Sequence, residues 1–121
     1  MGILENAKLK LKSKVGSEFD VDKKQAMELL GDDSVRVIDV RTKEEIDKVE
    51  PLVEDAIIID YHSENFKEEI EKLPKDVTYL LVWTGGVRSL GACDMMKKMG
   101  FEKIYNLKGG LKEFKDCNEW G

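Results

Sequence analysis

Short apolar segments alternate with amphipathic ones along most of this chain, and this alternation limits the folds open to it. The runs 56–59 and 78–83 are strongly apolar, the run 35–40 is apolar except for Arg36 and Asp39, and two shorter runs, 19–21 and 104–107, are mostly apolar. Continuous apolar runs of this length are typical of strands that are buried on both faces of a sheet. The sequence therefore predicts an α/β domain with a parallel sheet covered by helices on both sides.

Helix signals lie between these runs. Asp22 with Gln25, and Thr42 with Glu45, have the spacing of capping boxes, so helices are predicted over 23–30 and 42–49. Glycines follow the first of these helices and the one predicted over 89–99, where they favour helix termination. Further helices are predicted over 65–73 and 111–117.

The charged residues are divided unevenly between the first residues and the rest of the chain. All 121 residues carry 20 basic and 25 acidic side chains, a net charge of −5, and residues 1–18 alone carry +2. We predict a single domain over 19–121, preceded by an N-terminal extension over 1–18. The lysines of this extension alternate with Leu9 and Leu11, so it could contact an acidic partner or a membrane surface; packing on the domain is the alternative that we favour.

Composition and charge argue against several classes of protein. A sequence pI near 5.0 argues against a nucleic-acid binder, and the apolar runs are too short to cross a membrane. Two cysteines without CxxC spacing and a single histidine, His62, argue against a disulfide framework or a metal site. We therefore expect a cytoplasmic monomer without a signal peptide, a cofactor or a metal.

Three segments follow strands where a parallel sheet would present a ligand site, namely 39–41, 60–62 and 83–89. The last is the most informative, because Gly85 and Gly86 permit a turn in which successive N–H groups face inward. Together with the guanidinium of Arg88 and the start of the following helix, these groups would form a cradle for an anion. A simple strand-to-helix turn is the alternative.

Taken together, the segments of this chain resemble the rhodanese-like (sulfurtransferase) domain over about residues 19–116. The matching parts are Phe66 and the stretches 37–45, 57–61, 79–82, 86–89, 99–101 and 104–110. The resemblance implies a single α/β domain with a mostly parallel, five-stranded sheet. It also implies a loop of the form Cys-x-x-Gly-x-Arg-Ser, whose cysteine carries a persulfide in active members.

When the chain is aligned with this loop, it matches the family at Gly86, Arg88 and Ser89 but has Trp83 where the family has its cysteine. An indole has no thiolate and cannot hold a persulfide. Upstream, the family's Gly-His-Ile-Pro-Gly segment is absent and about two residues are added between Glu45 and Ala56. Both departures alter the surroundings of the loop.

The other cysteines are poor replacements for the missing one. Cys93 is expected to face the sheet as a buried thiol, and Cys117 is expected to be exposed in a polar tail, where neighbouring carboxylates disfavour its thiolate. Trp83 would either plug the pocket, which we favour, or form the aromatic floor of a binding site. Trp120 would be either an anchor for the tail or an exposed side chain.

These observations favour a non-catalytic module that binds a small oxyanion (sulfate, thiosulfate or phosphate) or a partner protein. The alternatives are a sulfurtransferase with a displaced or partner-supplied cysteine, and a structural or regulatory interaction domain with an occluded loop. Asp39 and Arg41 also match the family and are expected to form a supporting polar network. The predicted binding residues are Trp83, Thr84, Gly85, Gly86, Val87, Arg88 and Ser89.

Overall fold

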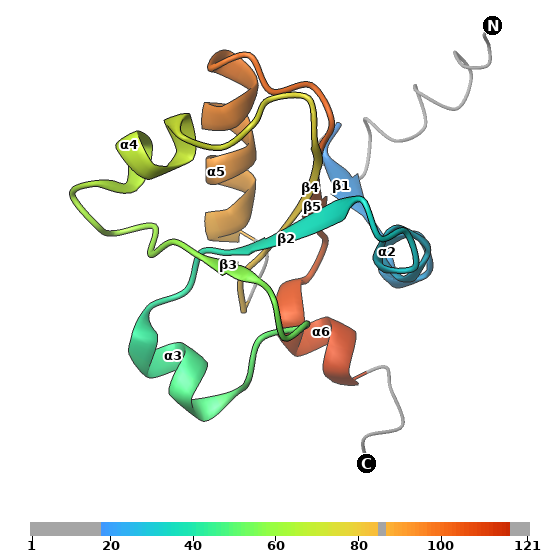
Figure 1. Cartoon of the computed structure of the whole chain (residues 1–121). Coiled ribbons are helices and arrows are strands. Elements are labelled where there is room, and N and C mark those ends of the chain that lie inside the picture. Colours follow the sequence, from blue (N-terminus) through green and yellow to red (C-terminus); the bar gives the residue numbers. More distant parts are fainter. Residues whose placement is uncertain (1–17, 85–86, 117–121) are drawn as a thin grey trace, which may run out of the picture.

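The computed structural model describes residues 18–84 and 87–116, in which strands and helices alternate (Figure 1). The order of the elements is β1 (Asp20–Val21), α2 (Lys23–Leu30), β2 (Val35–Asp39), α3 (Lys43–Lys48), β3 (Ile57–Ile58), α4 (Phe66–Glu71), β4 (Thr78–Val82), α5 (Val87–Lys98), β5 (Ile104–Leu107) and α6 (Gly110–Asp116).

The five strands form one sheet in the order β1-β5-β4-β2-β3, and every pairing in it is parallel. One row of paired residues crosses the whole sheet, from Asp20 through Asn106, Leu81 and Ile38 to Ile57. Because all strands run in one direction, their carboxyl ends share one edge of the sheet, where ligand sites of open α/β sheets lie.

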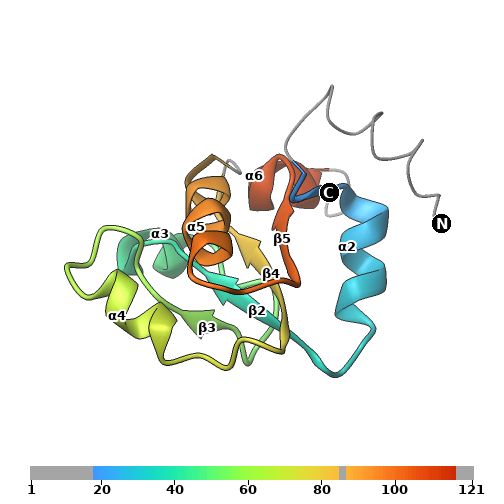
Figure 2. The same ribbon diagram turned by 90° about the horizontal axis from the view of Figure 1, so that it is seen from above.

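Helices cover both faces of this sheet, as Figures 1 and 2 show: α4 and α5 lie on one side, and α2 and α6 on the other. Each face has its own apolar core. The first includes Ile38, Leu81 and Met96, and the second includes Val37, Leu80 and Leu111. The sheet is therefore the middle of three layers, and the α/β prediction is confirmed.

The two predicted capping boxes are confirmed. Asp22 accepts a hydrogen bond from the Gln25 backbone N–H, and the Gln25 side chain accepts one from the Asp22 N–H. Thr42 and Glu45 form the same reciprocal pair at the start of α3. Each pair supplies partners to backbone N–H groups that a helix leaves free at its N-terminus.

Two predictions about the elements are wrong. The run 56–59 was expected to be a buried strand, but only Ile57–Ile58 is a strand, and the Ile58 side chain is 46% exposed. The reason is that β3 is an edge strand, so it lacks a neighbour on its outer side. In addition, α5 begins at Val87 rather than at residue 89, so Arg88 lies in its first turn.

Within the part of the chain that the structure describes, no helix has the length and apolar character needed to span a bilayer.

Candidate functional site

The candidate site lies where β4 ends and α5 begins, at the carboxyl edge of the sheet. Trp83 and Thr84 directly follow β4, and Arg88 and Ser89 lie in the first turn of α5. The predicted binding residues Gly85 and Gly86, with the side chain of Val87, lie outside the described residues.

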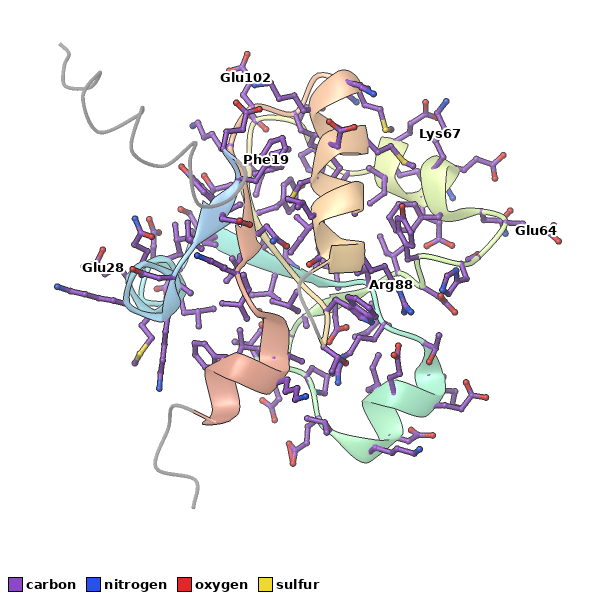
Figure 3. All side chains as sticks on the ribbon, turned by 180° about the vertical axis from the view of Figure 1, so that it is seen from behind. Phe19, Glu28, Glu64, Lys67, Arg88 and Glu102 are labelled. Atoms are coloured by element: carbon purple, nitrogen blue, oxygen red, sulfur yellow. The ribbon has the colours of Figure 1, made fainter. Side chains whose placement is uncertain are left out.

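Three side chains form a compact cluster at this position. The guanidinium carbon of Arg88 lies 4.1 Å from the centre of the Trp83 ring, in cation–π geometry. The Arg88 Nη1 donates to Glu45 Oε1 at 3.1 Å, and the Trp83 Nε1 donates to Glu45 Oε2 at 3.4 Å. The Arg88 side chain, labelled in Figure 3, is only 17% exposed. The cationic group at the loop is thus held by an aromatic face and by a carboxylate of the same chain.

Glu45 joins the loop to the start of α3. One of its carboxylate oxygens accepts from the backbone N–H of Thr42 at 2.8 Å, in addition to its contact with Arg88. Partial burial acts to raise the pKa of Glu45, but hydrogen bonds from Thr42 and Trp83 and the charge of Arg88 outweigh it, so the pKa lies below its usual value. Glu45 is therefore ionised near neutral pH and neutralises Arg88.

The sequence prediction did not include Glu45 among the site residues. Its capping-box spacing placed it correctly in the first turn of a helix. The missing step was topological: β2 pairs with β4, so the helix after β2 starts next to the loop after β4. That signal could have identified Glu45 once the strand order was assumed.

The backbone of the loop is fixed from the opposite side by α6. The carbonyl of Trp83 accepts from the Leu111 N–H at 2.8 Å, and the carbonyl of Thr84 accepts from the Lys112 N–H at 3.0 Å. Gly110 makes this approach possible, because it has φ +68° and a Cβ there would lie 2.3 Å from each of the two carbonyl oxygens. The loop and α6 therefore form one unit.

Ser89 does not join the cluster around Arg88. Its hydroxyl is buried and donates to the side-chain oxygen of Asn106 on β5. The Asn106 amide in turn donates to Asp20 of β1 at 2.8 Å. Ser89 thus connects α5 to strands β5 and β1, and its hydroxyl bonds to Asn106 rather than facing the Arg88 cluster.

Asp39 and Arg41, predicted to support the site, form a buried polar pair at the end of β2. The Arg41 Nε lies 2.9 Å from Asp39 Oδ1 and its Nη2 lies 2.9 Å from Asp39 Oδ2, a two-pronged contact. Both side chains are almost completely buried. This pair fixes the chain where β2 ends, just before Thr42 caps α3.

The cysteine and histidine side chains contribute little at the loop. Cys93 is fully buried among apolar residues, as predicted, and burial followed by the nearby charge of Asp20 raises the pKa of its thiol. His62 is exposed. Cys117 and Trp120 lie outside the described residues. Across residues 18–84 and 87–116, no group of three or more His, Cys, Asp or Glu side chains could hold a metal ion.

Comparison with known proteins gives a consistent result. A family model described as the rhodanese-like domain matches residues 22–117. A putative sulfurtransferase from Bacillus subtilis is 31% identical over 80 residues, covering 66% of this chain and 73% of that protein. A sulfurtransferase from Allochromatium vinosum is 27% identical over 93 residues, covering 76% and 83%.

Solved structures show the same fold. The crystal structure of a rhodanese-related protein from Thermoplasma volcanium has a TM-score of 0.68 and 21% identity, covering 80% of this chain and 90% of that one. The solution structure of a rhodanese-like domain from Anabaena sp. has a TM-score of 0.70 and 20% identity, covering 83% and 75%.

Proposed function

This chain belongs to the rhodanese-like domain family, and we propose that it acts as a non-catalytic module that binds a small oxyanion of the sulfate, thiosulfate or phosphate type. The observation that carries this proposal is the position of Arg88. Its guanidinium lies on the Trp83 ring at the loop and bonds to the carboxylate of Glu45. An arginine that already pairs with one oxyanionic group has the geometry to pair with another.

Trp83 is the reason to exclude persulfide chemistry at this loop. It occupies the position that holds the cysteine in active family members, and it cannot supply the attacking sulfur. The one described thiol, Cys93, is buried on the sheet side of α5 with a raised pKa, so it has little thiolate character. The module therefore binds without turnover.

Glu45 competes with an incoming anion for the guanidinium of Arg88. Its carboxylate already bonds to Arg88 at 3.1 Å, so an incoming anion must replace it or share the guanidinium, which has five N–H donors. Competition of this kind weakens binding and makes it sensitive to salt. We therefore expect millimolar rather than micromolar affinity for a simple inorganic anion.

Titration of sulfate and thiosulfate into the full chain, followed by NMR, tests this proposal. We expect shifts of the Trp83 indole N–H and of the amides around Thr84 and Arg88, and loss of these shifts in Arg88→Ala. Arg36→Ala is the matched control, because Arg36 is an exposed arginine on β2, away from the loop. The absence of any shift at the loop would instead favour an occluded interaction domain, and the same change in both variants would refute the role of Arg88.

A sulfurtransferase is the second candidate, because relatives covering most of this chain bear that name. Such an activity would need Cys117, Cys93 or a cysteine of a partner. A thiosulfate-to-cyanide assay on the wild type and on Cys93→Ser and Cys117→Ser separates the candidates. We expect no turnover in any of them; turnover that disappears with one cysteine would establish the enzyme.

We also propose that the protein is a cytoplasmic monomer without a nucleic-acid partner. The cysteine spacing, which is not that of a disulfide framework, favours the cytoplasm. The acidic net charge argues against nucleic-acid binding.

A further inference from the structure

A groove separate from the loop is lined by residues of α3, of α4 and of the edge strand β3. Figure 1 shows β3 between these two helices. Its volume is about 530 Å³. Ile46, Ile58 and Ile59 supply its apolar lining, and Trp83, Glu45 and Arg88 are not part of it.

The sheet edge at this groove has no strand beyond it among the described residues, since β3 is the last strand in the order. Ile59 and Tyr61 direct their backbone N–H groups to carbonyls of Asp39 and Val40 on the inner side. In a parallel ladder, the residue before Ile59 points its backbone groups the other way. Ile58 thus presents both a branched apolar side chain and an outward backbone edge, the features to which an extended segment can add.

Negative charge dominates around the groove. Asp47, Asp60 and Glu69 line it, against Lys43 and against Arg41, which is already paired within the protein. The surrounding segment 43–76 holds 12 acidic residues and 5 lysines, a net charge of −7. The net charge of the whole chain is −5, so its acidity is concentrated here.

We propose that this groove docks an extended segment of a partner protein in which basic residues alternate with branched apolar ones. The apolar side chains would pack on Ile46 and Ile58, and the basic ones would meet Asp47, Asp60 and Glu69. This interaction does not depend on anion binding at the loop.

The charge on the chain favours another protein as the occupant over a second copy. Residues 8–12 of this chain have the required basic and apolar alternation, but two copies, each with a net charge of −5, repel one another. Within one molecule, Ile57 lies four strand spacings from Asp20, about 19 Å through the sheet and farther around its helix layers. A path over one helix layer adds about 20 Å to the roughly 19 Å across the sheet, since a helix is about 10 Å thick. The residues between Leu11 and β1 span only about 30 Å when fully extended, which is shorter than that path.

The test uses the full chain and a nine-residue peptide, Lys-Val-Lys-Ile-Lys-Val-Lys-Ile-Lys, with blocked ends. An isomer with its five lysines together and its apolar residues together is the control for charge alone. NMR titration is expected to show shifts at β3, α3 and α4 with the alternating peptide and clearly weaker binding of the isomer. Equal binding of the two peptides, or no binding, would overturn the proposal.

Matched variants test the position of the binding surface. Ile58→Lys places a cation in the groove and should weaken peptide binding about tenfold. Met27→Lys makes the same change at an exposed position on α2 (56% exposed) and should leave the affinity within about twofold. Equal weakening by both variants would overturn the proposal. Self-association of the chain that Ile58→Lys abolishes, seen by sedimentation, would overturn the choice of a foreign partner by identifying a second copy as the occupant.

Discussion

Replacing Gly110 with alanine tests the claim that the loop and α6 form one unit. Gly110 has φ +68°, and an added Cβ would lie 2.3 Å from the carbonyl oxygens of both Trp83 and Thr84. The left-handed backbone costs an alanine about 1–2 kcal/mol. Relief of the clash requires the loop and α6 to separate, which breaks their two hydrogen bonds at about 1 kcal/mol each. Gly110→Ala should therefore lower the free energy of unfolding by about 3–4 kcal/mol.

Gly100→Ala is the control that separates backbone strain from the clash. Gly100 also has positive φ, +105°, but its added Cβ would meet only the flexible side chain of Lys75 at 3.5 Å. Its expected cost is therefore the strain alone, about 1–2 kcal/mol. Urea denaturation followed by circular dichroism measures both variants, and thermal unfolding should place Gly110→Ala about 6–10 °C below Gly100→Ala. Two variants of equal stability would refute the close approach of α6 to the loop.

Three further predictions concern the charges and the thiol. Asp39→Asn leaves Arg41 buried beside a neutral partner and should cost about 3–5 kcal/mol in urea denaturation, whereas Asp94→Asn breaks the exposed Asp94–Lys98 pair and should cost less than about 1 kcal/mol; equal costs would refute the importance of the buried pair. Because the pKa of Glu45 is lowered in the folded chain, its contribution to stability is present above its unfolded pKa and is lost as pH falls through the lower folded pKa. The Trp83 indole N–H signal should therefore shift in that acidic range in the wild type and not in Glu45→Gln, and a shift in both would contradict the assignment. Cys93 should react with Ellman's reagent only as fast as the chain unfolds. The reaction is measured in Cys117→Ser, in which Cys93 is the single remaining thiol, and rapid labelling of the native chain would refute the burial of Cys93.

Local features made most of the fold predictable from the sequence. The capping boxes at Asp22 and Thr42 involve residues three positions apart, so they can be read without tertiary contacts. The apolar runs at β2 and β4 become inner strands because strands inside a covered parallel sheet bury side chains on both faces. The prediction that Ile58 lies in a buried strand was wrong because an apolar run does not reveal that its strand lies at the sheet edge.

The site was less predictable because its contacts join distant parts of the chain. Glu45 meets Trp83 and Arg88 across 38 and 43 positions of sequence. Similarly, Ser89 bonds to Asn106, which is 17 positions away, so its hydroxyl faces the sheet rather than a ligand. Such pairings depend on the strand order, which local patterns do not specify.

The proposed exchange between Glu45 and a bound anion gives the most direct test of the central claim. Glu45→Gln keeps a side chain that can complete the capping box but removes the negative charge from Arg88. NMR titration of thiosulfate into this variant should show shifts at Trp83 and Arg88 with an affinity about three- to fivefold tighter than in the wild type, the scale of a partly exposed ion pair. Unchanged or weaker binding in Glu45→Gln would contradict the account of Arg88 as an anion-binding group held by Glu45.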